Sequence, residues 1–297
     1  MKEKTLSKIL ISITILSFSA SAFLAVYQLK KEGVATVFSF LNQNKKIKIL
    51  IVPGHEPDAG GADEFKKIKE RDLNLQLSLL LKENLSKNTN FDVILARDQS
   101  GWDPNLENYT KTSSTTIMNW VADMKAKMLA KVKTGEVQLI NQDMVHNYAT
   151  DEAVLFLYGI NKWIAENNVD LVLHVHFNSN PKINGKPNYN GYCIYVPEKQ
   201  YSNASSSLIF ANYLNKEFSK IEKPSNMPQE KNTIIPDQQL IAIGEYGTLK
   251  IPVAVVEYAY IYEPKMLSSG TRNSFINSAA SSTAMAINKY IIDNFQR

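Results

Sequence analysis

Histidine and glutamate side chains lie at the ends of three predicted strands in this chain. His55 follows a β-branched run, His176 closes the run Leu-Val-Leu-His-Val-His, and Glu257 closes the run Pro-Val-Ala-Val-Val-Glu. In open α/β sheets, ligands bind beyond the carboxyl ends of the strands. We therefore expect these three side chains to converge at one edge of a sheet, although they are far apart in the sequence.

Those residue types suit a catalytic metal. A catalytic zinc takes three protein ligands from His, Asp or Glu and keeps one position for water, and hydrolysis also needs a carboxylate that moves a proton. Glu70, in the first turn of the next predicted helix, is a fourth candidate, with Glu56 and Glu64 as competitors. A single histidine is usually just hydrogen-bonded in a core or on a surface. The hypothesis of a metal site therefore rests on the whole set of residues and not on any one of them. A closed structural zinc site is disfavoured, because the chain has one Cys and four His.

The elements that must position these residues alternate along the chain. Predicted strands span residues 46–53, 91–96, 169–176, 191–196 and 251–258, and predicted helices span 73–85, 151–168, 205–221 and 272–295. This alternation predicts a single α/β domain with a central, mostly parallel sheet flanked by helices. Residues at about 99–150 do not follow it, and we interpret them as an insertion with a helix over 116–132.

The N-terminal segment indicates export. Residues 9–29 carry no charged side chain and are bracketed by lysines, and as a helix they are long enough to cross a hydrocarbon core of roughly 30 Å. We interpret residues 1–31 as a signal anchor with a transmembrane helix, and the alternative is a signal peptide cleaved after Ala20-Ser21-Ala22. Residues 32–45 are then a linker. The domain at 46–297 is expected to be extracytoplasmic, held at the cell membrane or, with a cleaved signal, secreted.

The amino-acid composition and the distribution of charge argue against nucleic acid as a partner. The chain is 44% hydrophobic with a net charge of +4, which is ordinary for a globular protein. Five lysines and one glutamate within residues 1–31 account for that charge, so the rest of the chain is neutral. We therefore expect no nucleic-acid partner.

Four short segments carry a family resemblance. They are Val-Pro-Gly-His55-Glu, Glu70-Arg-Asp-Leu-Asn-Leu, Leu-His-Val-His176-Phe-Asn-Ser and Pro252-Val-Ala-Val-Val-Glu257. In this order they resemble the signature segments of zinc-dependent N-acetylmuramoyl-L-alanine amidases of the type 3 family. The resemblance covers about residues 46–295, interrupted by the insertion. It favours Glu70 over the other acidic candidates, because Glu70 alone precedes Asp-Leu-Asn-Leu.

The resemblance implies roles for four residues. His55, Glu70 and His176 would bind Zn²⁺, and Glu257 would be the catalytic general base. It also implies an α/β sandwich of the phosphorylase/hydrolase-like type that forms an amidase catalytic domain. The substrate would be peptidoglycan, cut between N-acetylmuramic acid and the L-alanine of the stem peptide.

Other residues depart from the family pattern or match it without a clear role. His174 stands where the family more often has a small polar residue, and we expect it to support a ligand or the structure, with direct ligation as the alternative. A Tyr-Ala-Tyr sequence follows Glu257 in place of the usual Gly-Phe pair. Arg97 is expected to have a surface or ion-pair role, Asn178 to shape its loop, and His146 to have no role in the site.

Two other functions remain open at this stage. One is a wall-binding or regulatory protein that keeps the fold without catalysis, and the other is a zinc peptidase that cuts a different peptidoglycan amide. The chain contains no GxSxG, GxGxxG or HExxH motif, so serine-hydrolase, dinucleotide and gluzincin functions have no support. For the insertion, we hypothesise either a lid over the substrate groove or a surface that recruits a protein activator.

Overall fold

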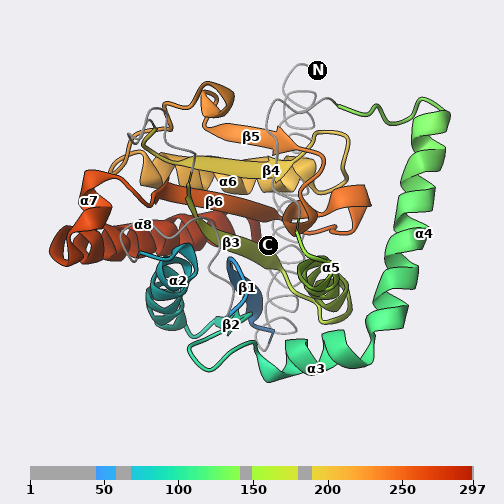
Figure 1. Ribbon diagram of the computed structural model, residues 1–297, viewed down its shortest axis with the longest axis horizontal. Coiled ribbons are helices and arrows are strands. Elements are labelled where there is room, and N and C mark those ends of the chain that lie inside the picture. The colour runs from blue at the N-terminus through green and yellow to red at the C-terminus, as the bar shows by residue number, and fades with distance from the viewer. Residues whose placement is uncertain (1–44, 58–67, 141–148, 180–188, 296–297) are drawn as a thin grey trace, which may run out of the picture. The chain divides into compact units, whose positions relative to one another are not determined.

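The computed structural model describes residues 45–57, 68–140, 149–179 and 189–295, and contacts group the chain from Ile47 onward into one compact unit. Its centre is a six-stranded sheet in the order β2-β1-β3-β6-β4-β5 (Figure 1). The strands are β1 (Ile47–Pro53), β2 (Phe91–Leu95), β3 (Leu171–Asn178), β4 (Cys193–Pro197), β5 (Ile234–Asp237) and β6 (Val253–Tyr260). All neighbouring strands are parallel except β4 and β6, which are antiparallel. The sheet is therefore mixed, as the single antiparallel pairing shows, but mostly parallel.

Helices cover both faces of this sheet. The longer helices are α2 (Glu70–Ser86), α3 (Pro104–Thr112), α4 (Ser114–Lys133), α5 (Asp151–Glu166), α6 (Ala204–Phe218) and α8 (Ser269–Phe295), and the shorter ones are α7 (Pro264–Leu267), η1 (Pro228–Glu230), η2 (Ile241–Ile243) and η3 (Glu245–Gly247). One core cluster joins the sheet to α2, α6 and α8, and a second joins its other face to α3, α5 and η2. The predicted α/β architecture with helices on both faces is confirmed.

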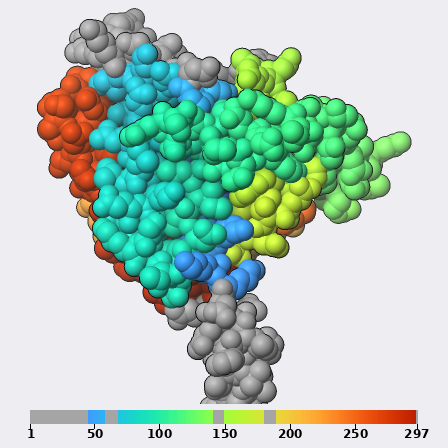
Figure 2. Space-filling view, turned by 90° about the horizontal axis from the view of Figure 1, so that it is seen from below, coloured from blue at the N-terminus to red at the C-terminus, as the bar shows by residue number. Residues whose placement is uncertain are grey.

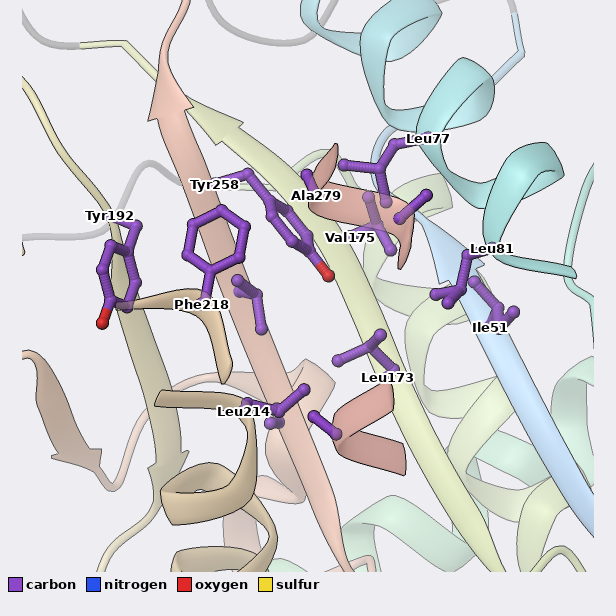
Figure 3. Close-up of a cluster of buried hydrophobic side chains, with 14 of the residues drawn as sticks. Ile51, Leu77, Leu81, Leu173, Val175, Tyr192, Leu214, Phe218, Tyr258 and Ala279 are labelled. Carbon is purple, nitrogen blue, oxygen red and sulfur yellow. The ribbon is translucent and has the colours of Figure 1, made fainter. Parts of the chain in front are cut away.

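Hydrophobic spacing explains why α2 packs as it does. Leu73, Leu77, Leu81 and Leu85 recur at helical spacing and are buried. Figure 3 shows Leu77 and Leu81 beside Ile51 and Val175 of the two neighbouring strands. Burying a leucine side chain stabilises the fold by about 1.5–3 kcal/mol. This packing fixes the first turn of α2 over the carboxyl ends of β1 and β3.

Several element boundaries differ from the sequence prediction. β3 continues to Asn178 and β6 continues to Tyr260, so His176 and Glu257 lie inside their strands rather than at the ends. The pairing register of these strands shifts just beyond this point, between His176 and Asn178. A β-bulge of this kind inserts one extra residue into one strand and redirects the side chains beside it, which strand periodicity does not reveal.

Helix α3 and strand β5, like α7 and the three short η helices, were not predicted from the sequence. Helix α3 begins at an Asp103 cap that accepts hydrogen bonds from Asn105 N and Leu106 N, with Pro104 in the first turn. Asp followed by Pro is a recognisable helix start, and only the polarity of the region concealed it. β5 contains Pro236. It forms an edge strand, the kind of strand that tolerates proline.

The insertion lies on the face covered by α5. Ile117 and Val121 of α4 are buried against Tyr158 of α5. Beyond α4, residues 138–140 are held by two glutamine side chains: Gln138 N–H donates to Gln200 Oε1 (2.7 Å) and Ile140 N–H donates to Gln238 Oε1 (2.9 Å). Figure 2 shows α3 and α4, in green, on the molecular surface.

These contacts place residues 138–140 of the insertion away from the predicted site. The two glutamines follow the carboxyl ends of β4 and β5. Because β4 runs antiparallel to β6, the carboxyl end of β4 lies at the opposite end of the strands from the carboxyl ends of β1, β3 and β6. The contacts therefore give no support to a lid over the site, whereas residues 141–148 of the insertion lie outside the described residues.

The predicted signal anchor at residues 1–31 also lies outside the described residues. Among the residues that the structure does describe, none of the helices combines the length and the apolar character needed to cross a membrane.

Candidate metal and catalytic site

The first part of the site is the tight exit from β1. Gly54 N–H donates to Val175 O (2.9 Å), and His55 then adopts a left-handed backbone conformation with φ of 66°. Histidine tolerates this region better than most residues, but it is uncommon outside glycine. Gly54 packs directly against the His176 ring, since a Cβ at Gly54 would lie 2.3–2.7 Å from three ring atoms. The missing side chain at Gly54 therefore makes room for His176.

Glu70 joins the two histidines. Its Oε2 lies 2.8 Å from His55 Nε2, and its Oε1 lies 3.0 Å from His176 Nδ1. The carboxylate is 3% exposed and also accepts a hydrogen bond from the Phe177 N–H (3.3 Å). Burial raises the pKa of Glu70, but hydrogen bonds and charge interactions with His176 and His55 outweigh burial and hold it well below its usual range. Glu70 therefore acts as a strongly ionised centre for the site.

These three residues lie close enough together to hold a metal ion. One ligand atom from each of His55, Glu70 and His176 lies within 4.8 Å of the others. The two histidine rings meet edge to face with centroids 5.2 Å apart. Their side chains are 28% and 22% exposed, whereas Glu70 is buried beneath them. The buried Glu70 carboxylate therefore holds both histidines, whose rings are partly open to solvent.

Glu257 lies beside this group on the next strand. It is the register partner of His176 in the parallel pairing of β3 and β6. Its Oε2 is inaccessible to solvent and has no hydrogen-bond partner among the described residues. Burial raises the pKa of Glu257 well above its usual range, and the nearby Glu70 and Glu230 carboxylates raise it further. The site therefore has one ionised carboxylate between its histidines and a second whose environment favours the proton.

Arg97 has a role that differs from the predicted surface or ion-pair role. It is 2% exposed, and its guanidinium donates to Pro53 O (3.2 Å), Gly54 O (2.7 Å) and Arg71 O (2.9 Å). Gly54 O also accepts from Asn74 Nδ2 (3.2 Å). Arg97 thus ties the end of β1 to the first turn of α2, between the backbone of His55 and that of Glu70. The prediction was wrong because β2, the strand just before Arg97, pairs directly with β1. This pairing buries the Arg97 side chain beside the end of β1.

His174 is a structural neighbour of the site. It is 1% exposed, shares a hydrogen bond with the Ala242 backbone, and is not one of the grouped ligand atoms. Burial lowers its pKa to about 3. The expectation of a supporting rather than a ligating role fits this position. The alternative acid Glu64 and the insertion histidine His146 lie outside the described residues, and Glu56 is not in the group.

Sequence reasoning missed Glu230. It is completely buried in η1, and its carboxylate accepts hydrogen bonds from Asn178 Nδ2 (2.8 Å), Tyr195 OH (3.3 Å) and Tyr260 OH (2.7 Å). It also raises the pKa of Glu257. A glutamate in the Pro-Gln-Glu segment of a polar loop carries no pattern that marks it as buried, so no sequence signal was available.

Comparison with known proteins agrees with this architecture. Residues 49–289 match a family model described as N-acetylmuramoyl-L-alanine amidase. No curated protein matches the chain significantly.

Solved structures of amidases share the fold. The CwlD amidase of Clostridioides difficile, solved in complex with the GerS lipoprotein, has a TM-score of 0.52 at 17% identity over 84% of this chain and 100% of its own. Ami1 of Mycobacterium smegmatis has a TM-score of 0.52 at 11% identity over 84% and 99%. The catalytic domain of CwlV, from Bacillus (Paenibacillus) polymyxa, has a TM-score of 0.50 at 16% identity over 82% and 98%. At these identities the structures establish a shared fold alone.

The family model spans most of the chain, from Ile49 in β1 into helix α8. The segments that position His55, Glu70, His176 and Glu257 all fall within it. The chain therefore belongs to the N-acetylmuramoyl-L-alanine amidase family, and it is an enzyme of that class.

Proposed function

We propose that this protein hydrolyses the amide bond between N-acetylmuramic acid and L-alanine in bacterial peptidoglycan, with zinc held by His55, Glu70 and His176. The observation that carries the proposal is the grouping of these three ligand atoms within 4.8 Å, beside the Glu257 carboxyl. Two histidines and one carboxylate form a ligand set known from catalytic zinc sites, which keep a further position for water.

The donor set supports a bound cation in two ways. Glu70 is ionised, buried and in contact with both histidines, so the three donors already lie together. The Glu257 Oε2 has no hydrogen-bond partner among the described residues, although it is buried beside that centre. A nearby positive charge would offset the burial and the two neighbouring carboxylates that keep Glu257 protonated.

The protein residues would share the chemistry as follows. Bound zinc would bring the pKa of a bound water to about 7 and polarise the scissile carbonyl. Glu257 would take the proton of the attacking water at Oε2 and return it to the alanine nitrogen as the carbon–nitrogen bond breaks. Such general acid–base catalysis contributes roughly 10²–10⁴ in rate. The exposed sides of His55 and His176 leave room for the substrate to approach.

The direct test uses purified protein and purified peptidoglycan, with products read by mass spectrometry. We expect release of intact stem peptides that begin with L-alanine, and we expect EDTA and the Glu257→Ala substitution each to abolish it. Zinc content of the wild type and of Glu257→Ala should be equal, which separates loss of the base from loss of the metal. Stem-peptide release that persists at full rate in EDTA would refute the zinc mechanism.

The same products separate the alternatives. A zinc peptidase would release shortened peptides and leave the first alanine attached to the glycan. A wall-binding protein without catalysis would bind one zinc and release nothing. The intact set of His55, Glu70, His176 and Glu257 argues against the second alternative, because all four side chains share one edge of the sheet.

We propose in addition that the insertion is a docking surface for a protein activator. Helix α4 packs through Ile117 and Val121, while Met118 and Leu129 on its outer side are 43% and 51% exposed. One of the solved amidases, CwlD, is in complex with a lipoprotein. Met118→Gln with Leu129→Gln should leave the purified enzyme unchanged and lower its activity in cells. Unchanged cellular activity would remove the docking role.

We also propose that residues 1–31 hold the enzyme at the outer side of the cell membrane, on the basis of their uncharged run between lysines. Cell fractionation should place the full chain in the membrane and a chain without residues 1–31 elsewhere. Recovery of a shortened, freely secreted chain would instead indicate a cleaved signal peptide.

A further inference from the structure

A buried carboxylate beyond the four predicted residues joins three strands of the site. Glu230 accepts hydrogen bonds from Asn178 on β3, Tyr195 on β4 and Tyr260 on β6. It is 0% exposed, and these partners are two hydroxyls and an amide. A buried carboxylate is costly unless its oxygens are hydrogen-bonded, and here its two oxygens share three donors.

These donors meet where the sheet is irregular. The register of β3 and β6 shifts between the pair His176–Glu257 and the pair Asn178–Tyr260. Bulges are common next to active sites, where they redirect side chains. Glu230 contacts the residues on both strands immediately past the shift, so it fixes the geometry just beyond Glu257.

The contact with Glu230 also determines which way the Asn178 amide faces. A carboxylate only accepts hydrogen bonds, so the Asn178 amide presents its Nδ2 donor to Glu230, at 2.8 Å from Oε1. The amide oxygen, Oδ1, therefore points away from Glu230. Asn178 is half-buried and follows His176 by two residues, on the same side of β3. Among the described residues no hydrogen bond to Oδ1 is found, so Oδ1 is a fixed acceptor that remains available to a ligand.

We propose that Glu230 is a positioning residue that holds the Asn178 amide so that Oδ1 accepts a hydrogen bond from a peptide N–H of the substrate. This inference rests on the proposed function, because it identifies the ligand as the stem peptide of a muramyl peptide. Replacing Glu230 by glutamine introduces an NH₂ group that competes as a donor. Asn178 can then turn its own NH₂ toward the substrate N–H, which removes the acceptor and adds a repulsive contact.

The first experiment measures binding without turnover. In the zinc-loaded Glu257→Ala protein, calorimetry gives the Kd for a soluble N-acetylmuramoyl tripeptide. We expect Glu230→Gln and Asn178→Ala each to raise Kd about tenfold, and the double substitution to raise it no further, because both remove the same hydrogen bond. A Kd for Glu230→Gln within twofold of the background, or a loss that multiplies in the double variant, would overturn the inference.

Glu217 provides a matched control. Its carboxylate is 3% exposed and pairs with Lys220 and Lys289 between α6 and α8. Glu217→Gln removes a buried carboxylate of the same size away from β3 and β6. We expect it to lower the thermal midpoint and to leave Kd unchanged. A rise in Kd equal to that of Glu230→Gln would show that general loosening, and not amide orientation, produces the effect.

A kinetic measurement with Glu257 present completes the test. Because the hydrogen bond exists in both the bound substrate and the transition state, Glu230→Gln should raise KM about tenfold. The kcat values are compared at each variant's own pH optimum, because removing the Glu230 charge also lowers the pKa of Glu257. A fall in kcat with unchanged KM would contradict the assigned role. If wild-type protein releases no stem peptide, the proposed function has failed. If the wild type is active and Glu230→Gln has the same KM, only this inference has failed.

Discussion

Glu70 determines the character of the site at the scale of single residues. It is the only one of the three grouped side chains that is buried, and it contacts both histidines. The hydrogen bonds and charge of His176 and His55 outweigh the cost of burial, so the pKa of Glu70 lies well below its usual range. A carboxylate that stays ionised over the whole physiological range is what a divalent cation requires.

We predict that Glu70→Gln lowers zinc affinity more than about 100-fold, since loss of the partners around a ligand already costs about 10–100-fold. The neutral amide keeps the shape and loses the charge. Competition with a chromogenic chelator measures the affinity. Asp72→Asn is the control, because Asp72 lies in the same helical turn with a side chain 67% exposed. Equal zinc affinity in Glu70→Gln and wild type would rule out Glu70 as a ligand.

At the scale of elements, the exit of β1 and the start of α2 are fixed to each other. Arg97 donates to Gly54 O and to Arg71 O, and Asn74 donates to Gly54 O as well. Each hydrogen bond from a charged group contributes about 1.5–3 kcal/mol. This junction holds His55 in its left-handed conformation, with φ of 66°. Backbone strain of this kind persists only where surrounding contacts determine it.

The closeness of Gly54 to His176 gives a prediction for this junction. In Gly54→Ala the new Cβ would lie 2.3–2.7 Å from the imidazole ring, so the ring must move away from Glu70. We expect at least a tenfold loss of zinc affinity, with a destabilisation of about 1–3 kcal/mol from overpacking.

Gly270→Ala is the matched control, since its Cβ would meet nothing closer than Ser268 Oγ at 3.9 Å. It should keep full zinc affinity and at least wild-type stability, because Gly270 is the second residue of α8 and alanine is accommodated in a first helical turn without a clash. Wild-type zinc affinity in Gly54→Ala would show that His176 does not need this position.

The junction of α5 and η3 gives a pH-dependent prediction. Tyr158 OH donates to Glu245 Oε2, and burial raises the pKa of Glu245 above its usual value. The folded state therefore keeps this proton longer than the unfolded chain, whose glutamate pKa is about 4.3. The resulting stabilisation is complete below that pH and is lost as the pH rises through the folded-state pKa.

Urea unfolding from pH 4 to pH 7 checks this. Glu245→Gln should become progressively more stable relative to wild type as the pH rises. Glu107→Gln, which removes a surface partner of Lys111, should show no such trend. A stability difference between Glu245→Gln and wild type that does not vary with pH would contradict the assignment.

At the scale of the whole molecule, one thiol reports on the integrity of the sheet. Cys193 is the single cysteine of the chain and is 0% exposed. Burial raises its pKa well above the usual value, and the Glu230 and Glu257 carboxylates add to this. A thiol that is both protonated and inaccessible does not react, so labelling requires the sheet to open.

We predict that iodoacetamide labels Cys193 only at the rate at which the domain unfolds, and that urea accelerates labelling in parallel with the loss of circular dichroism. Added zinc should slow labelling, because a ligand bound by the folded state alone stabilises it. Fast labelling of the native protein at pH 8 would instead show that β4 opens locally.

The sequence alone predicted the order of the main elements and proposed four residues for the site. Leucines at helical spacing predicted α2, and β-branched runs predicted β1, β3 and β6. Because parallel strands end on the same side of a sheet, the sequence predicts that His55, His176 and Glu257 lie close together. Local periodicity and strand direction were enough for this, since both are properties of short segments.

Only the tertiary structure decided what supports that site. Arg97 became buried because β2 pairs with β1, and Glu230 became a partner of Asn178 because a loop more than fifty residues away closes over β3, β4 and β6. Neither segment carries a periodic pattern. Burial of a charged residue depends on donors from distant strands, and the register shift that gathers those donors beyond Glu257 forms only when β3 and β6 pair.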